Sequence, residues 1–407
     1  MGKYTTYGEG VDQEIERDYL DKIIKSFVKD CNPISIILFG GFGKGEGSVY
    51  FENGKPIPFN DFDLYVVTKE KLSDEDLDRI SMNASKDIGM GGLEIAHYPN
   101  EDYDIRRHFH VDVRCLPIDK LDSLMSIQRY YELKYGTQVI YGDESVLDKI
   151  VEIKKENLPE SDGLRNLFNK LHTMLLGLRK DYNEDTRRVR IFWSYKCYMS
   201  ICEALLISEK EFEPTASKRM RRFEEIFDYS FPELKSKIPD LIEKVRVATN
   251  FKLKPEFKAD VGKLWEEALK DILIVFEFYI KRMTGLDDVR GAINNKLPYS
   301  YFKPFLKEKI RFNFWPSQYV LNLGYFNVLR NEGEFYLKPL FQWKDVGLRL
   351  ILPVYYLLKY KSDGNDKWLE VAFEELKNFI KVDKKDFWYL KERALKAYGL
   401  YYEQRLI

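Results

Sequence analysis

Residues 34–67 decide the fold, and they read ISIILFGGFGKGEGSVYFENGKPIPFNDFDLYVV. Two short apolar and β-branched runs within them, ISIILF at 34–39 and DFDLYVV at 61–67, are typical of buried strands. Between the runs lie a glycine-dense stretch at 40–48 and then Asn53-Gly54, a dipeptide that favours a tight turn between extended pieces. The segment therefore predicts two strands, connected by a glycine turn and an inserted hairpin.

The glycine stretch favours the binding of an anion. Gly40 and Gly41 directly follow the first predicted strand, and further glycines recur at every second position up to residue 47. Backbone N–H groups left free in such a turn can face anionic oxygens. The spacing does not match G-x-G-x-x-G, and Gly43-Lys44 is followed by Gly45 where a P-loop has Ser or Thr. The stretch is thus a phosphate-friendly turn of another kind.

Three carboxylates accompany this turn. Asp61 and Asp63 stand two positions apart on the second predicted strand, so their side chains project from the same face. Asp112 lies on a further predicted strand at 108–116. Adjacent carboxylates on buried strands repel one another, and a divalent cation is the usual compensation. If the strands are neighbours, three oxygen ligand groups suit Mg²⁺, while two histidines just before Asp112 leave zinc as an alternative.

Taken in order, these motifs resemble the signature of the DNA polymerase β-like nucleotidyltransferase superfamily. The matching pieces are Phe39-Gly40-Gly41 with Gly45-Glu46, then Asn60-Asp61-Phe62-Asp63-Leu64, then Val111-Asp112-Val113. The stretch YGTQVIYGD at 135–143 is similar to the one that often closes the catalytic domain of stand-alone members. The resemblance covers residues 12–145. It departs from the family where Gly41 replaces a frequent serine, and where the hairpin lengthens the gap before Asp61.

The resemblance implies transfer of a nucleoside monophosphate, expected to be AMP, from a nucleoside triphosphate such as ATP to a hydroxyl acceptor, with release of pyrophosphate. It implies Asp61, Asp63 and Asp112 as catalytic residues and as ligands of two Mg²⁺ ions. Two lysines are candidates for contacts with the phosphates, and each also has an explanation without function. Lys44 would then be an ordinary solvated lysine, and the stem of Lys196 would lie along an apolar helix face. The residues expected to bind the nucleotide are Gly40, Gly41, Lys44, Gly45 and Lys196.

The rest of the chain is predicted to be mostly helical. Before the change in character near residue 146, we expect helices at 12–30 and 70–88 and a strand at 93–98; afterwards, helical periodicity marks 163–180, 188–208, 216–228, 257–283, 345–361, 366–381 and 384–403. The predicted fold class is α+β: a polymerase β-like nucleotidyltransferase domain, with a mixed sheet and flanking helices, followed by a large helical body. The predicted domains are 1–145, 146–285 and 286–407.

Bulk properties narrow the function classes. The 407 residues, 44% of them hydrophobic, are enough for two or three packed domains, and the net charge of −1 argues against nonspecific coating of nucleic acid. Four cysteines without paired spacing, and no run long enough to span a membrane, predict a cytoplasmic protein with reduced thiols.

The sequence does not identify the acceptor, which can be a small molecule, a sugar, a tRNA end or a protein hydroxyl. The acceptor is expected to be selected by the helical body, whose sequence carries no recognisable motif for it. Two alternatives of other classes also stay open. One is a nucleotide-sensing scaffold without catalysis. The other is an RNA-binding or RNA-modifying module that uses the basic stretch at 218–222 and the basic and aromatic stretch at 296–315.

Overall fold

The computed structural model describes the chain except for residues 1, 94–100, 181, 298–316, 343–345 and 403–407. It forms two compact units. Unit 1 comprises Met1–Ile95, Asp102–Pro159 and Tyr182–Ala259, and unit 2 comprises Ala96–Glu101, Glu160–Asp181 and Asp260–Ile407. This division does not test the three sequence domains, which stay a prediction.

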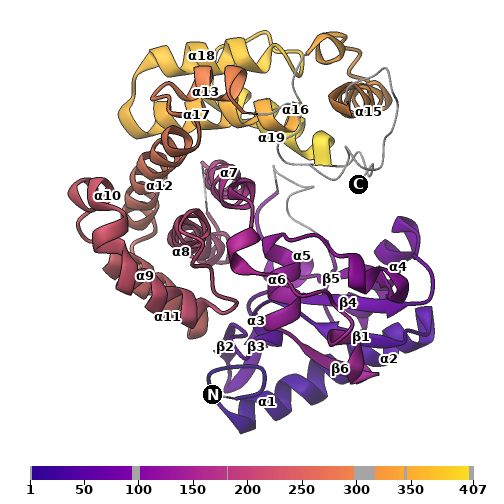
Figure 1. The fold of residues 1–407 in the computed structure, drawn as a ribbon. Helices are drawn as coiled ribbons and strands as arrows, with labels where there is room; N and C mark the ends of the chain where they lie inside the picture. Colours follow the sequence, from indigo (N-terminus) through magenta and orange to yellow (C-terminus); the bar gives the residue numbers. More distant parts are fainter. Residues whose placement is uncertain (1, 94–100, 181, 298–316, 343–345, 403–407) are drawn as a thin grey trace. The chain divides into compact units, whose positions relative to one another are not determined.

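Unit 1 is built around a four-stranded mixed sheet with the strand order β5-β4-β1-β6 (Figure 1). β4 pairs in parallel with β5 and antiparallel with β1, and β1 pairs antiparallel with β6. The α+β fold class predicted from the sequence is therefore confirmed, with a small mixed sheet in the N-terminal part and helices in most of the remainder. The four strands are β1 (Ser35–Leu38), β4 (Phe62–Thr68), β5 (Val111–Pro117) and β6 (Gln138–Gly142).

Apolar clusters cover both faces of the sheet, which explains why its two central strands are mostly apolar. Phe62 and Leu64 belong to a buried cluster with residues of the N-terminal helices and of α4 (Asp74–Asp87). Tyr65 and Val67 face the other way and pack in a second cluster that includes Leu133 of α6 (Gln128–Tyr135). The period of two along β4 thus sends alternate side chains into two separate cores.

The predicted hairpin between β1 and β4 is confirmed. β2 (Val49–Glu52) pairs antiparallel with β3 (Lys55–Pro58), and the turn places Asn53 and Gly54 in the left-handed region, with φ of 51° and 80°. This is the backbone conformation that an Asn-Gly hairpin turn requires. The preceding glycine stretch folds into one short helical turn, α3 (Gly40–Gly43).

Further helices complete unit 1. The predicted N-terminal helix is confirmed. It is a continuous helical stretch made of α1, a π-helical turn at Glu16–Leu20 and α2. α8 packs against both α9 and α11, and the side chains of Asn183 and Thr215 cap α8 and α9. The helices are α1 (Glu9–Ile15), α2 (Asp21–Cys31), α5 (Ile105–His108), α8 (Glu184–Ser208), α9 (Ala216–Ser230), α10 (Pro232–Lys237) and α11 (Leu241–Leu253), with 3₁₀ turns at Ile118–Ser123, Glu144–Leu147 and Lys155–Asn157.

The regular elements among the described residues of unit 2 are all helices. α7 packs against α12, α17 and α19, and α17 also packs against α18. Gly285 and Gly364 end α12 and α17 in the left-handed conformation that glycine adopts without strain. The elements are α7 (Glu160–Leu176), α12 (Val261–Thr284), α13 (Val289–Asn295), α15 (Ser317–Asn331), a 3₁₀ turn at Lys338–Phe341, α16 (Val346–Arg349), α17 (Ile351–Asp363), α18 (Asp366–Leu376) and α19 (Phe387–Tyr402).

Two sequence predictions differ from the structure. The strand expected at 108–116 begins only at Val111, because the Asp104 side chain accepts hydrogen bonds from the amides of Arg106 and Arg107 and starts α5. The single helix expected at 345–361 is divided into α16 and α17. The strand expected at 93–98 lies almost wholly outside the described residues. No helix in the described part of the chain is both long enough and apolar enough to cross a membrane.

Candidate active site

Asp63 and Asp112 are direct neighbours on adjacent strands. In the parallel pairing of β4 with β5, Asp63 is the register partner of Asp112. Register partners in a sheet point to the same face, and neighbouring strands lie about 5 Å apart. Both side chains are half-buried, and Asp61 immediately precedes β4. The structure therefore brings together two of the three expected carboxylates across strands, and places the third two residues before one of them.

The electrostatics of Asp63 reflect this crowding. Burial, followed by the negative charges of Asp112 and Asp61, raises the pKa of Asp63 to about 7. The positive charges of Lys196 and Arg114 act in the opposite direction but do not cancel the effect. A carboxylate in this position is stabilised by any additional cation. The strand pair thus concentrates negative charge at one point of the sheet.

The side chains of Asp112 and Asp61 each lie near a basic side chain. Asp112 Oδ2 lies 3.1 Å from Arg114 Nη2, and Asp61 Oδ1 lies 3.7 Å from His110 Nδ1. Within the described ranges, no group of three or more His, Cys, Asp or Glu side chains is arranged to hold a metal ion. The fit for a divalent cation therefore depends on the all-oxygen donor set of the adjacent pair Asp63 and Asp112, which suits Mg²⁺.

The histidines considered for zinc do not share a strand with Asp112. His108 is the last residue of α5 and is only 2% exposed. Its ring stacks on Tyr103, with 5.4 Å between ring centroids, and its Nδ1 lies 3.0 Å from the carbonyl oxygen of Asp104. His110 precedes β5. The alternating strand geometry that made zinc a candidate is therefore absent at these positions.

The glycine turn touches the carboxylates directly. Gly40 has a φ of 61°, and a Cβ atom there would lie 2.1 Å from Asp63 Oδ2, so only glycine fits without displacing that carboxylate. The amide of Phe39 donates to the Asp63 carbonyl oxygen at 2.8 Å. From β6, Gln138 Nε2 donates to the Gly43 carbonyl oxygen at 3.2 Å. The turn is thus fixed on both sides, against β4 and β6.

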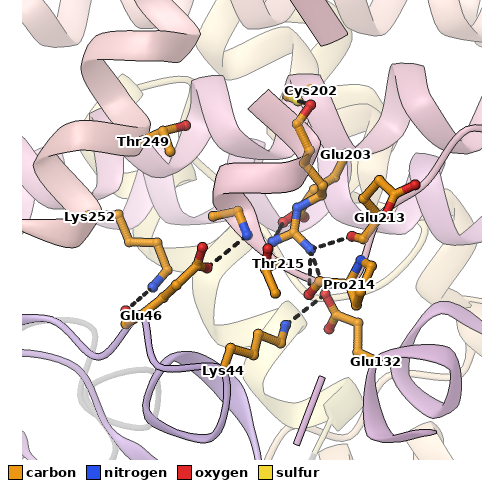
Figure 2. Close-up of polar contacts among 12 residues, drawn as sticks. Lys44, Glu46, Glu132, Cys202, Glu203, Glu213, Pro214, Thr215, Thr249 and Lys252 are labelled. Atoms are coloured by element: carbon orange, nitrogen blue, oxygen red, sulfur yellow. Dashed lines mark hydrogen bonds and ion pairs between the residues drawn. The ribbon is translucent and has the colours of Figure 1, made fainter. Parts of the chain in front are cut away.

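Lys44, expected at the triphosphate, lies in a buried ion pair. Its Nζ is 2.9 Å from Glu132 Oε1, and its side chain is 7% exposed. Glu132 Oε1 also accepts from Arg219 Nη1 at 2.8 Å, and Arg219 Nη2 lies 3.0 Å from Glu203 Oε1 (Figure 2). The ammonium of Lys44 is therefore already engaged, and its contact with a nucleotide stays a prediction.

A second set of contacts ties the glycine turn to α9 and α11. The buried carboxylate of Glu46 accepts from the amides of Ala216 and Ser217, the first residues of α9, at 2.8 and 2.9 Å. A carboxylate at a helix N-terminus is stabilised by the helix dipole. Lys252 Nζ, from α11, donates to the Glu46 carbonyl oxygen at 2.6 Å, as Figure 2 shows. Burial tends to raise the pKa of Glu46, but Lys252 and the hydrogen bonds lower it below its usual value.

Sequence reasoning did not find Lys252. Burial lowers its pKa to about 8, although the charge of Glu46 opposes this effect, and Lys44, Arg219 and Lys196 also lower it. A Cβ atom at Gly41 would lie 3.1 Å from Lys252 Nζ, so this ammonium is next to the turn. Lys252 lies near the end of α11, far from the turn in sequence, and no local pattern connects the two.

Lys196 is the candidate lysine that acts on both parts of the site. It is half-buried on α8, and its Nζ lies 4.4 Å from the centroid of the Phe192 ring. Its positive charge lowers the pKa of Asp63 and that of Lys252. The carboxylate pair, the glycine turn and two lysines from helices therefore belong to one region of unit 1.

Comparisons with known proteins found a distant structural likeness but no match in sequence. No family model matches the chain, and no curated protein matches it in sequence. Among solved structures, the chain is similar to spectinomycin adenyltransferase AAD(9) from Enterococcus faecialis with ATP and spectinomycin. The identity is 13%, the match covers 62% of this chain and 97% of that chain, and the TM-score is 0.34. A likeness of this size leaves function to be argued from the chain's own residues.

Of the two basic stretches considered for RNA binding, the structure describes 218–222 in full and 296–315 only at its first two residues. In the stretch 218–222, Arg219 is buried in the ion network described above, and Arg222 pairs with Glu211 and Glu225 at 3.0 and 2.7 Å. Acidic side chains therefore balance the charge of these two arginines. The stretch 296–315 lies outside the described residues from position 298 onward.

Proposed function

We propose that this chain is a nucleotidyltransferase that moves a nucleoside monophosphate from a nucleoside triphosphate, with ATP as the expected donor, to a hydroxyl acceptor. One observation carries the proposal: Asp63 and Asp112 are register partners on parallel strands, and Gly40 lies directly against Asp63. Paired carboxylates beside an anion-friendly turn are the arrangement that phosphoryl transfer requires.

The carboxylates of Asp63 and Asp112 would hold Mg²⁺ as the central pair. Asp61 would join them by exchanging its contact with His110 for the metal ion. When bound, Mg²⁺ supplies charge stabilisation and a template for in-line displacement. The raised pKa of Asp63 supports this assignment, because a nearby cation would relieve the repulsion that causes it.

The remaining steps belong to the chain's own groups. The backbone amides at Gly40 and Gly41 and the ammonium groups of Lys196 and Lys252 hold the phosphates in place. Asp112 takes the proton from the attacking hydroxyl. A bond forms between the acceptor oxygen and the α-phosphorus, the bond from that phosphorus to the bridging oxygen breaks, and pyrophosphate leaves with the electron pair.

The test is a transfer assay with an α-labelled nucleoside triphosphate, Mg²⁺ and a cell extract as the source of acceptors. We expect pyrophosphate release and a labelled product whose chemistry identifies the acceptor as a small molecule, sugar, tRNA or protein. Asp63→Asn and Asp112→Asn should each lower transfer by a factor of about 10³ or more while the fold is kept.

Asp119→Asn is the matched control, because Asp119 lies just after β5, pairs with Lys120 and has an exposed side chain. It should transfer at the wild-type rate. Transfer near the wild-type rate by Asp63→Asn or Asp112→Asn would overturn the proposal. Binding of ATP without any pyrophosphate release would favour the nucleotide-sensing scaffold instead.

A further inference from the structure

Three lysines of unit 2 surround one tryptophan. Trp388 and Lys391 lie three residues apart on α19 and so share a helix face. Lys361 comes from the last turn of α17, and Lys180 follows α7 in the chain. Their Nζ atoms lie 5.6 Å (Lys180), 5.8 Å (Lys361) and 5.7 Å (Lys391) from the centroid of the indole ring. We call these four residues the Trp388 cluster.

The cluster carries positive charge without a matching acid. None of its three lysines forms an ion pair with any residue that the structure describes. Lys391 is only 3% exposed. Its burial and the nearby charge of Arg179 lower its pKa to about 8, while Glu392 acts in the opposite direction. An ammonium group that has lost much of its hydration and has no carboxylate partner is only partly compensated.

A purely structural role explains only part of this arrangement. One lysine can gain from a cation–π contact with an indole ring, and a lysine stem can pack along an aromatic face. Three ammonium groups within 5.8 Å of the same ring centroid gather like charges in one place, which one cation–π contact does not require. A bound anion beside the ring would reduce this concentration of positive charge. The cluster is therefore better matched to an anionic ligand than to packing alone.

The aromatic member indicates what kind of anion fits. Trp388 is only partly buried, so part of its ring system is accessible. Single-stranded nucleic acids are held by aromatic side chains that stack on bases, together with lysines that contact the phosphates. We propose that the Trp388 cluster binds a nucleotide unit of single-stranded nucleic acid, with a base on the indole and the flanking phosphates on the lysines. This site shares no residue with the proposed active site.

The test measures binding of a fluorescently labelled oligouridylate of about ten nucleotides to the full-length chain by anisotropy. We expect the exposed pair Lys180→Met and Lys361→Met, combined in one variant, to weaken binding about tenfold and to reduce the salt slope by about 1.4. Trp388→Leu should weaken binding about tenfold through lost stacking. Lys391→Met should also weaken it, with thermal unfolding reporting whether that buried substitution affects the fold.

Lys384→Met is the matched control. Lys384 is exposed on the segment before α19 and lies near Tyr389 rather than Trp388. It removes one positive charge close to the cluster and should change affinity by less than about twofold. Equal losses from the control and from the double-lysine variant would overturn the proposal, because the effect would then be one of general charge.

Two competitors identify the part of the ligand that is recognised. Unlabelled oligouridylate should displace the probe from the wild type far better than inorganic tripolyphosphate does, and Trp388→Leu should remove that preference. Displacement by tripolyphosphate at equal phosphate concentration, unaffected by Trp388→Leu, would overturn the assignment of a nucleotide unit. If free ATP displaced the probe and the unlabelled oligonucleotide did not, the ligand of the cluster would be a mononucleotide and not a single-stranded nucleic acid.

Discussion

The ammonium of Lys252 lies next to the position that a side chain on Gly41 would occupy. A Cβ atom at residue 41 would be 3.1 Å from Lys252 Nζ and equally close to the carbonyl oxygen of Glu46. Lys252 is one of the groups proposed to hold the phosphates, so this close approach connects the residue at position 41 with nucleotide binding.

Gly41→Ser should therefore disturb nucleotide binding in this chain. The new side chain crowds Lys252, and we expect ATP to bind about tenfold more weakly in calorimetric titration. Lys252→Met should weaken binding as well. The double variant should lose less than the sum of the two single losses, by about 1 kcal/mol, because removing the ammonium makes room for serine.

The control for crowding is Gly10→Ser, since a Cβ atom at Gly10 would meet nothing within 4 Å. It should leave ATP affinity unchanged. Additive losses from Gly41→Ser and Lys252→Met would show that the two positions act independently, and would contradict the expected crowding.

The buried carboxylate of Glu132 should be important for stability. It compensates both Lys44 and Arg219, whose side chains are 7% and 6% exposed. Glu132→Ala leaves two buried cations with less compensation, and we expect the free energy of unfolding to fall by about 3 to 5 kcal/mol in urea titrations. Glu144→Ala, at an exposed position of the same unit, should change it by less than about 0.5 kcal/mol. Similar values for the two variants would mean that the network contributes little.

Local patterns predicted the elements around the site. The strands β1 and β4 and the Asn-Gly hairpin were predicted because apolar runs and turn residues act over a few positions. The strand β5 was predicted too long at its start, because the alternation of HFHVDV concealed the capping by Asp104 that starts α5. A short helical turn before a strand leaves the period of two almost intact, so the pattern alone does not separate them.

Contacts between segments that are distant in the chain could not be predicted from local sequence patterns. The pairing of Asp63 with Asp112 depends on the register of two strands, and the motif order suggested their proximity without setting that register. Lys44 was expected at a phosphate because a lysine flanked by glycines gives no sign of a partner, yet Glu132 neutralises it. Lys252 had no local signal, since only the packing of α11 brings it to the turn.

Magnesium should stabilise the wild-type chain through the carboxylate pair. A ligand that binds only the folded state raises the free energy of unfolding by about 2.7 kcal/mol at a hundred times its Kd. We expect Mg²⁺, added with ATP, to raise the melting temperature of the wild type in differential scanning fluorimetry, and EDTA to reverse this. Asp63→Asn should show no such shift, whereas Asp119→Asn should behave as the wild type. An unchanged melting curve of the wild type would contradict the proposed metal site.

In unit 2, the ion pair of Glu334 should make stability depend on pH in the acid range. Glu334 accepts from both terminal nitrogens of Arg393, at 2.8 and 3.0 Å, and from Lys396 at 3.2 Å. These contacts, Arg393 first, hold its pKa at about 2, below the ordinary 4.5. Because the folded chain holds this proton less tightly than the unfolded chain, the contribution is complete above pH 4.5 and is lost as the pH falls toward 2.

Glu334→Gln should therefore lower the free energy of unfolding by about 2 kcal/mol at pH 7, an amount reduced for partial exposure of the pair. Its difference from the wild type should shrink steadily between about pH 4.5 and pH 2. Glu332→Gln, exposed two residues earlier, should match the wild type at every pH. Urea titrations at several pH values give these differences. A constant difference between Glu334→Gln and the wild type over that range would mean that packing, and not the charge of the pair, stabilises this part of unit 2.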